Sequence, residues 1–253
     1  MRFTYLMFLL YFFLFLNCKS KKHHLSKISV SQISIDNSLE PNADVENFIK
    51  PYRDYINTEL DSILTYSANT YSKTDGFLNT AIGNYMADVV YDQANPIFKT
   101  WSGHEIDMVL LNHGGIRAIV PQGPISARHA YELMPFENTI VIVALKGSQV
   151  NNLTTYLAKN KIAHPISKLQ LILNANFNII EAKIKGRTVN PKKTYYVATS
   201  DYLLNGGDNM TFFKAHDTVY ETRYKIRNAL IDNFKKVDTI NPEIDLRLIQ
   251  IKD

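Results

Sequence analysis

Cysteine is almost absent from this sequence, in which Cys18 is the only one among 253 residues. One cysteine cannot form an internal disulfide or supply a cluster of thiolates, which excludes disulfide scaffolds, zinc ribbons and iron–sulfur proteins. A strong charge of either sign is lacking too, since 28 basic residues against 24 acidic ones leave a net charge of +4. This charge is too small to indicate nucleic-acid binding.

The apolar stretch at the N-terminus is too short to span a membrane. It covers residues 3–16, whereas a transmembrane helix needs roughly 20 residues. With Arg2 before it and Lys19 after it, the stretch is typical of a secretory signal. Its end, Leu-Phe-Leu-Asn-Cys at 14–18, resembles a bacterial lipoprotein signal, in which cleavage exposes a cysteine that becomes lipid-modified. The alternative is a short buried helix with an ordinary free cysteine.

This resemblance predicts three segments. We expect a signal peptide over 1–18 with lipidation of Cys18, a polar stalk over 19–36 and a folded domain over 37–253. The protein would then be exported and held by its lipid at a membrane, facing the periplasm.

The remainder has the composition of a globular domain, with 45% hydrophobic and 21% charged residues in the whole chain. Apolar residues three and four apart predict helices, and short apolar runs predict strands. The expected helices cover 41–66 with a kink at Pro51, 79–93 with Asn79 or Thr80 as cap, 149–158 and 218–237. The expected strands cover 106–111, 139–145, 169–173, 179–184 and 195–199, with a turn at 185–187. This mixed order predicts an α+β fold.

The first of three loops suited to a ligand is 112–117, Asn-His-Gly-Gly-Ile-Arg, which follows a predicted strand. Gly114 and Gly115 let the backbone turn sharply and approach a ligand closely. Arg117 can present its planar guanidinium to a phosphate or a carboxylate. The alternative is a surface turn with a solvated arginine.

The second loop is 134–139, Met-Pro-Phe-Glu-Asn-Thr, which leads into a predicted strand and also contains Asn138. Because Phe136 stands between a proline and a charged residue, it is poorly placed for the core of a strand. We expect it at an edge, where it can meet a ligand. A core phenylalanine is the alternative.

The third loop is 201–209, Asp-Tyr-Leu-Leu-Asn-Gly-Gly-Asp-Asn. The run Asn205, Gly206, Gly207 favours a turn that presents Tyr202 and Asp208 together. A carboxylate can accept hydrogen bonds from a ribose diol, and stacking of a base on an aromatic ring is worth about 1–3 kcal/mol. The alternative is a structural turn.

With 49–52, Ile-Lys-Pro-Tyr, and 82–88, Ile-Gly-Asn-Tyr-Met-Ala-Asp, the three loops closely resemble the C-terminal, substrate-binding domain of the 5'-nucleotidase family. That family includes periplasmic UDP-sugar hydrolases and ecto-5'-nucleotidases. The resemblance runs from about residue 40 to the C-terminus. It implies a four-layer α-β-β-α sandwich that binds a nucleotide or nucleoside.

The resemblance also implies roles for five residues. Phe136 and Tyr202 match two aromatic residues that stack on the base, the second of which is usually Phe. Arg117 matches an arginine at the phosphate and sugar end, and Asn112 matches an asparagine near the base. Asp208 matches the acid that binds the ribose hydroxyls.

The chain departs from the family pattern at three places. The family has a second substrate arginine shortly before the 82–84 stretch, but 73–78 contains only Lys73 as a cation, which lacks the planar fork of arginine. His113 stands where glycine is common, and Glu137 where a small residue is common. These departures bear on phosphate affinity more than on recognition of base and ribose.

The signature runs of the family's metallophosphoesterase domain are absent from the sequence: Asp-x-His, Gly-Asp-x-x-Asp, Gly-Asn-His-Asp/Glu and Gly-His-x-His. We therefore expect no catalytic residues, metal ligands or cofactor in this chain, and divalent metals on a separate metallophosphoesterase chain. The predicted function is the nucleotide-recognition half of a split 5'-nucleotidase in nucleotide catabolism. The alternative is a nucleotide- or nucleoside-binding lipoprotein without hydrolysis, or a degenerate structural domain.

Overall fold

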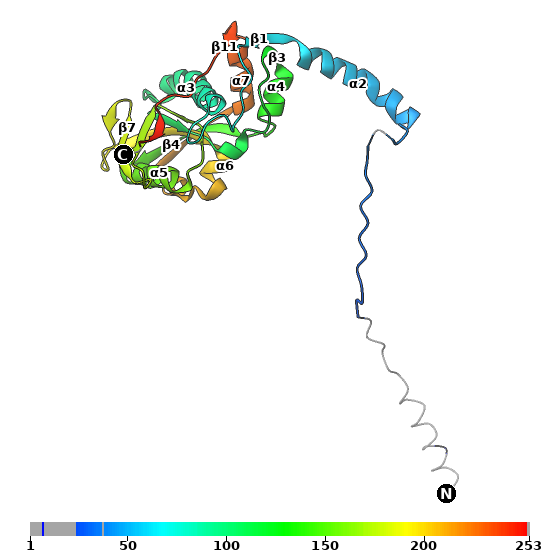
Figure 1. Ribbon diagram of the computed structural model, residues 1–253, viewed down its shortest axis with the longest axis horizontal. Helices are drawn as coiled ribbons and strands as arrows, with labels where there is room; N and C mark the ends of the chain where they lie inside the picture. The colour runs from blue at the N-terminus through cyan, green and yellow to red at the C-terminus, as the bar shows by residue number, and fades with distance from the viewer. Residues whose placement is uncertain (1–6, 8–23, 37, 252–253) are drawn as a thin grey trace. The chain divides into compact units, whose positions relative to one another are not determined.

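The computed structural model describes residue 7, residues 24–36 and residues 38–251 (Figure 1). The chain divides into two units, Met1–Ile49 and Lys50–Asp253. The predicted signal peptide, the lipidation at Cys18 and the first part of the predicted stalk lie outside the described residues, apart from residue 7. Of the helices in the described part, none has the length and apolar character needed to cross a membrane.

Helix α2 spans Ala43–Asp61 and begins where Asn42 accepts hydrogen bonds from the backbone N–H groups of Asp44 and Val45 at 3.1 Å. The prediction of a helix over 41–66 is confirmed for this part, which contains Pro51. It is wrong for the last residues, because strand β1 spans Ile63–Ser67. The apolar spacing of three and four continues into β1, but this segment hydrogen-bonds to two other strands.

The central sheet has five strands in the order β10-β4-β9-β2-β5. These strands span Thr218–Lys225, Thr139–Lys146, Thr194–Ser200, Met108–Leu110 and Ile166–Ser167. β9 runs parallel to β2 and antiparallel to β4, which is also antiparallel to β10. Since side chains alternate between the two faces of a strand, the unbroken apolar run of β4 is buried on both sides of the sheet.

Each face of the central sheet carries its own apolar core. On one face, α3 (Ala81–Ser102) and α7 (Ile226–Phe234) pack against Ile140 and Ile142 of β4. On the other face, α5 (Gly147–Asn160) packs against Val141 and Val143, so α3 and α5 lie on opposite sides of β4 (Figure 1). The predicted α+β sandwich is confirmed.

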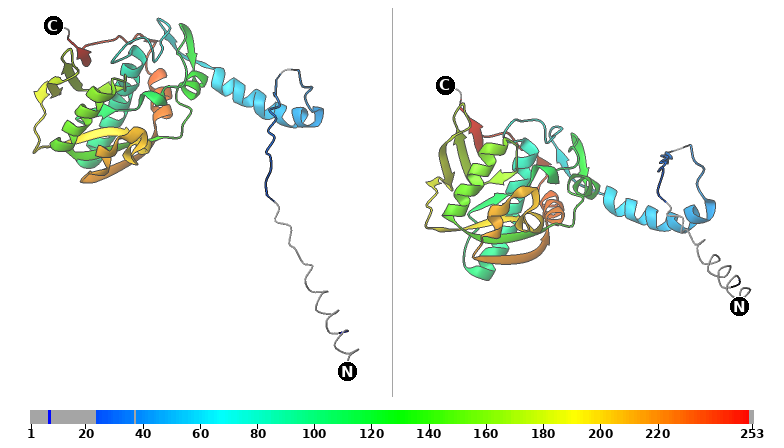
Figure 2. Two further views of the ribbon diagram at one scale, coloured as in Figure 1. Left: turned by 60° about the horizontal axis from the view of Figure 1, so that its bottom comes forward. Right: turned by 90° about the horizontal axis from the view of Figure 1, so that it is seen from below.

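Two smaller sheets complete the fold (Figure 2). The four-stranded sheet β12-β6-β7-β8 shares the core on the α5 side, and the three-stranded sheet has the order β11-β1-β3. Their remaining strands span Leu248–Gln250, Leu169–Leu173, Ile179–Ile184, Arg187–Thr188, Thr239–Ile240 and Gly123–Ser126. The predicted turn at 185–187 joins β7 to β8, with Lys185 and Gly186 both at positive φ, as a tight hairpin turn requires.

The other predicted elements agree with the structure, with shifts at their ends. The helix predicted over 79–93 begins after Thr80, whose hydroxyl accepts from the backbone N–H of Gly83 at 3.1 Å, and continues through Pro96 to Ser102. The helix predicted over 149–158 is α5. The five predicted strands are β2, β4, β6, β7 and β9, of which β2 is shorter than expected.

The helix predicted over 218–237 is wrong in its first part, because residues 218–225 form β10 and α7 begins only at Ile226. The β10 segment is rich in β-branched and aromatic residues, which favour strands. The Thr222 hydroxyl donates to the Ile140 carbonyl of β4 at 2.6 Å. Arg223, at φ 56°, lies where the pairing of β10 with β4 shifts register, shortly before α7 begins.

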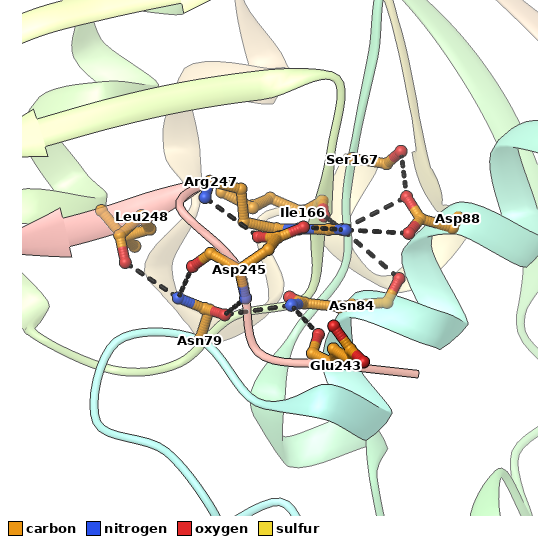
Figure 3. A network of polar contacts seen from close by, with 9 residues as sticks. All are labelled: Asn79, Asn84, Asp88, Ile166, Ser167, Glu243, Asp245, Arg247 and Leu248. Atoms are coloured by element: carbon orange, nitrogen blue, oxygen red, sulfur yellow. Dashed lines mark hydrogen bonds and ion pairs between the residues drawn. The ribbon is translucent and has the colours of Figure 1, made fainter. Parts of the chain in front are cut away.

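A polar network fastens the C-terminal segment to α3 (Figure 3). Arg247 lies between two carboxylates, donating from Nη2 to Asp88 at 2.9 Å and to Asp245 at 2.7 Å. Its Nη1 also donates to the Ile166 carbonyl at 2.6 Å. The Asn79 side chain donates to the Leu248 carbonyl at 2.9 Å, at the start of β12. This network holds β12 against the rest of the fold.

Candidate functional site

The three predicted loops meet at one edge of the central sheet. β2 and β9 are parallel, so their C-terminal ends, which lead into 112–117 and 201–209, lie at the same edge. β4 is antiparallel to β9, which places its N-terminal end and the preceding loop 134–139 at that edge too. The C-terminal end of β10 lies there as well, because Lys225 pairs with Thr139.

A cavity of about 290 Å³ opens between these loops. The five residues predicted to bind substrate line it together with three of the predicted supporting residues: Asn112, Gly114, Gly115, Arg117, Phe136, Asn138, Tyr202 and Asp208. The other predicted supporting residues, Asn205, Gly206 and Gly207, do not line the cavity but shape the loop that carries Tyr202 and Asp208. The structure thus brings the five residues predicted to bind substrate together around one cavity.

The loop 112–117 is held in place by hydrogen bonds to the segment 163–164. The backbone N–H of His113 donates to His164 Nδ1 at 3.2 Å, and His113 Nδ1 lies 3.1 Å from the Ala163 carbonyl oxygen. A Cβ at Gly115 would lie 3.1 Å from Asn112 Oδ1, so this position needs glycine if Asn112 is to keep its orientation. The conformation of the loop therefore depends on a small residue and on His164.

His164 is buried, and burial lowers its pKa to about 4. It is therefore neutral at neutral pH. Because its Nδ1 accepts a hydrogen bond, the proton of the neutral ring is assigned to Nε2. Within the described part of the chain, this Nε2 has no hydrogen-bond partner.

Phe136 is 40% exposed at the cavity, and the Arg117 guanidinium lies 5.8 Å from its ring centroid. The main chain at Phe136 is held by Arg227 of α7, which is 4% exposed and donates from Nη1 to the Phe136 carbonyl at 3.4 Å. The Arg227 guanidinium also stacks on Tyr131, 4.1 Å from the ring centroid. A buried arginine thus supports the exposed aromatic ring.

Glu137 does not line the cavity and pairs with Lys225 and Arg227. These hydrogen bonds lower the pKa of Glu137 to about 2, so its carboxylate stays charged at neutral and at mildly acidic pH. Its negative charge, which departs from the family pattern, is therefore compensated within the protein.

Asp201 joins the second and third loops. It accepts from Asn138 Nδ2 at 3.1 Å, from the Thr139 hydroxyl at 3.0 Å and from the backbone N–H of Tyr202 at 2.8 Å. It begins the short helix α6 (Asp201–Leu204). This carboxylate fixes the spacing between the two loops that carry the aromatic residues.

Tyr202 and Asp208 are bonded to each other. The Tyr202 hydroxyl donates to Asp208 Oδ1 at 2.8 Å and accepts from the Asp208 backbone N–H at 3.3 Å. The bond to the carboxylate raises the pKa of Tyr202, so the hydroxyl stays protonated at neutral pH. A Cβ at Gly207 would lie 2.4 Å from the Tyr202 ring, and only glycine leaves room for the ring there.

Sequence reasoning did not single out Arg227, Asp201 or His164. Asp201 lies beside Tyr202 in the third loop, and its acidic side chain at the start of a turn was an available signal. Arg227 and His164 reach the site from segments distant in sequence, and nothing local marks them.

The side chains around the cavity are suited to bind a ligand that has an aromatic ring, an anionic group and hydroxyl groups. Two exposed rings can stack on a planar group, the Arg117 guanidinium can hold an anion, and the Asp208 carboxylate can accept from hydroxyl groups. Among the residues described, no group of three or more His, Cys, Asp and Glu side chains could hold a metal ion.

Comparison with known proteins identifies relatives of this fold. A family model described as "5'-nucleotidase, C-terminal domain" matches residues 58–215. The apyrase of Tabanus yao is 24% identical over 256 residues, covering 91% of this chain and 46% of that protein. Protein UshA of Escherichia coli (strain K12) is 31% identical over 135 residues, covering 52% of this chain and 23% of that protein.

A solved structure agrees with the fold. The 5'-nucleotidase precursor from Thermus thermophilus superposes with a TM-score of 0.68 at 20% identity, covering 82% of this chain and 43% of that one. The chain spans less than half the length of each of these three proteins.

Proposed function

Because the chain belongs to the 5'-nucleotidase C-terminal domain family, we propose that it is the nucleotide-recognition half of a split 5'-nucleotidase, acting in nucleotide catabolism. The observation that carries this proposal is the cavity itself. It gathers Asn112, Arg117, Phe136, Tyr202 and Asp208 from three loops at one sheet edge. Aromatic rings, a planar cation and a carboxylate match the base, phosphate and ribose of a nucleotide.

Each residue has a proposed role that follows from its chemistry. Phe136 and Tyr202 stack on the base, and Asn112 bonds to the base edge. Asp208 accepts from the ribose, and Arg117 binds the phosphate with its fork of N–H donors.

Hydrolysis would come from a separate metallophosphoesterase chain that docks over the cavity. Its divalent metals would supply a metal-bound water as nucleophile and stabilise the charge on the phosphate. The residues of this chain would hold the nucleotide by its base and ribose. Arg117 would hold the phosphate where the metals of the partner can reach it. The order of events is therefore recognition here and chemistry on the partner.

Calorimetric titration of the purified full chain with AMP and adenosine tests recognition. Phe136→Ala and Tyr202→Ala should each weaken binding of both ligands by about 1–3 kcal/mol, because each removes a stacking surface. Unchanged affinity in the double variant would refute the site. A phosphate-release assay with Mn²⁺ or Zn²⁺ then tests the division of labour, and release by this chain alone would overturn it.

A second candidate function is nucleotide or nucleoside binding without hydrolysis. The observation in its favour is the sparse positive charge of the site: among the described residues that line the cavity, Arg117 is the only cation, and Lys73 is not one of them. Adenosine binding as tight as AMP binding, with no metallophosphoesterase chain captured by the nucleotide-loaded protein, would favour this candidate.

We also propose that the protein is exported and anchored through a lipid on Cys18. The support is the N-terminal sequence alone: a basic start, a short apolar stretch and a cysteine where that stretch ends. Cys18→Ala should move the protein from the membrane fraction to the soluble fraction. An unchanged distribution would refute the anchor.

A further inference from the structure

A second cavity lies at the opposite edge of the central sheet. It has a volume of about 500 Å³ and opens between the β7–β8 hairpin and the beginning of β9, where Tyr195 lines it. The loop 201–209 of the first cavity follows the other end of β9. Since β9 has seven residues and a strand rises about 3.3 Å per residue, the two cavities are about 20 Å apart. β7 and α6 accordingly lie on opposite sides of the fold in Figure 1, and a ligand in the second cavity does not reach the first.

Positive charge gathers around this second cavity. Lys185, Arg187 and Lys193 line it, and Asp107 is the one carboxylate among the described residues that do so. The sequence has the same bias, because residues 159–193 contain eight lysines and arginines but a single acidic residue, whereas the whole chain has a net charge of +4. A concave surface lined by charge of one sign concentrates ions of the opposite sign. The second cavity is therefore suited to an anion.

The three cations differ in whether they have a partner. Lys185 Nζ lies 3.3 Å from Glu105 Oε2, and Lys193 Nζ lies 3.5 Å from Asp107 Oδ1. Arg187 is exposed, and among the described residues it has no hydrogen bond or ion pair. Its planar guanidinium can donate two parallel hydrogen bonds to a phosphate. Arg187 thus offers a complete set of donors at the cavity.

The wall of the cavity beside Arg187 is fixed by its own contacts. The backbone N–H of Gly147 donates to the Lys193 carbonyl at 2.7 Å, and a Cβ at Gly147 would lie 2.0 Å from the Asn190 carbonyl oxygen. The backbone N–H of Asn190 donates to the Tyr195 hydroxyl at 2.8 Å. Because this wall is already ordered, a ligand does not have to bear the entropic cost of ordering it.

We propose that the second cavity binds a phosphate group carried on a small polar body, of which glycerol phosphate is the simplest example. Arg187 holds two phosphate oxygens, and Lys185 and Lys193 add positive charge. The side chains of Thr188 and Asn190, which also line the cavity, bond to hydroxyl groups of the polar body. The volume of about 500 Å³ exceeds that of a phosphate ion and falls within the range of about 300–1,000 Å³ for small-molecule sites.

This chemistry is shared by a soluble phosphate ester and by the head group of an anionic phospholipid. NMR titration of the full chain with sn-glycerol 3-phosphate, followed through the backbone amides of 187–193, tests the soluble ester. We expect a saturable shift and binding at least about threefold tighter than that of inorganic phosphate, which lacks the hydroxyl groups. Arg187→Gln should weaken binding about tenfold, and Arg187→Lys should weaken it less.

Lys192→Gln is the matched control, because Lys192 is an exposed cation that follows Asn190 closely but does not line the cavity. It should change the affinity by less than about twofold, since an exposed charge outside the cavity is screened. Equal losses in Arg187→Gln and Lys192→Gln would overturn the inference, because diffuse surface charge would then be responsible.

Co-sedimentation with vesicles of phosphatidylglycerol and phosphatidylcholine tests the head group, in Cys18→Ala protein so that a lipid anchor plays no part. Vesicle binding that Arg187→Gln abolishes and Lys192→Gln preserves would assign the site to a phospholipid. Glycerol phosphate binding without vesicle binding would assign it to a soluble ester. If neither probe binds, the inference is wrong, whereas AMP binding at the first cavity is unaffected by that outcome.

Discussion

Arg247 in the polar network and Arg117 in the cavity differ in how many of their N–H donors are bonded within the protein. The Arg247 side chain is 15% exposed and donates to Asp88, to Asp245 and to main-chain carbonyls (Figure 3). Arg117 is exposed, and among the described residues its guanidinium donates only to the Gly114 carbonyl, at 3.3 Å. Arg247 is therefore engaged in holding the fold together, whereas most N–H donors of Arg117 are available to a ligand.

The polar network and the cavity also differ in whether their buried polar atoms have hydrogen-bond partners. In the described part of the chain, those without a hydrogen-bond partner are Thr65 Oγ1, His164 Nε2 and Arg227 Nε. His164 and Arg227 support the cavity loops, and none of the three belongs to the network of Figure 3. Leaving such an atom unpaired costs about 1–3 kcal/mol. The fold therefore satisfies its polar groups at the C-terminal segment and tolerates unsatisfied ones beneath the cavity.

The largest effect is expected from breaking the network. Arg247→Met leaves Asp88 and Asp245 close together without their shared cation. Both carboxylates are partly exposed, so we expect a loss of about 3 kcal/mol in the free energy of unfolding, at the low end for a buried pair. Urea unfolding measures it. Arg117→Met is the matched control and should change stability by less than about 0.5 kcal/mol; equal losses would erase the contrast between the two arginines.

The next effect concerns pH and the buried His164. Its pKa is about 4 in the folded protein and about 6.5 when unfolded, so the unfolded state binds the proton first as pH falls. The contribution of neutral His164 to the free energy of unfolding is complete above pH 6.5 and is lost as the pH falls toward 4. The loss is about 2 kcal/mol between pH 6.5 and 4.5. Urea unfolding at several pH values measures the slope.

His164→Gln, which keeps an acceptor for the His113 N–H, should remove that part of the slope. His216→Gln replaces an exposed histidine and should leave it unchanged. A slope that survives in His164→Gln would show that another group is responsible.

The residues predicted from the sequence are those that stand in contiguous loops at strand ends. Arg117, Phe136, Tyr202 and Asp208 could be singled out from their places in loops next to predicted strands, whereas Asn112 was assigned through the family resemblance. Parallel strands bring the loops at their C-terminal ends together. Arg227 could not be found in this way, since it reaches Phe136 from 91 residues away, through α7. The first part of the helix predicted over 218–237 was wrong for a similar reason. The spacing of its apolar residues is ambiguous, and the segment is a strand because it pairs with the distant β4.

A smaller effect is expected from Arg117 when binding is measured. Arg117→Met should weaken AMP about tenfold and leave adenosine nearly unchanged, because the side chain has donors to spare for a phosphate. Arg117→Lys should recover only part of the loss, since an ammonium lacks the planar fork. Equal losses for AMP and adenosine would assign Arg117 to the base or the ribose.

The smallest effect is expected from Arg227→Lys, which tests whether the unsatisfied arginine under the cavity acts through Phe136. A lysine can keep a charge near Glu137 but loses the stacking on Tyr131 and the bond to the Phe136 carbonyl. Adenosine and AMP should both bind about threefold more weakly, because the ring is less well held. In a Phe136→Ala background the same change should have no further effect, since the ring that Arg227 positions is gone. Additive losses would mean that Arg227 affects the ligand by another route, and the contrast with the self-contained Arg247 network would then rest on Arg117 and His164.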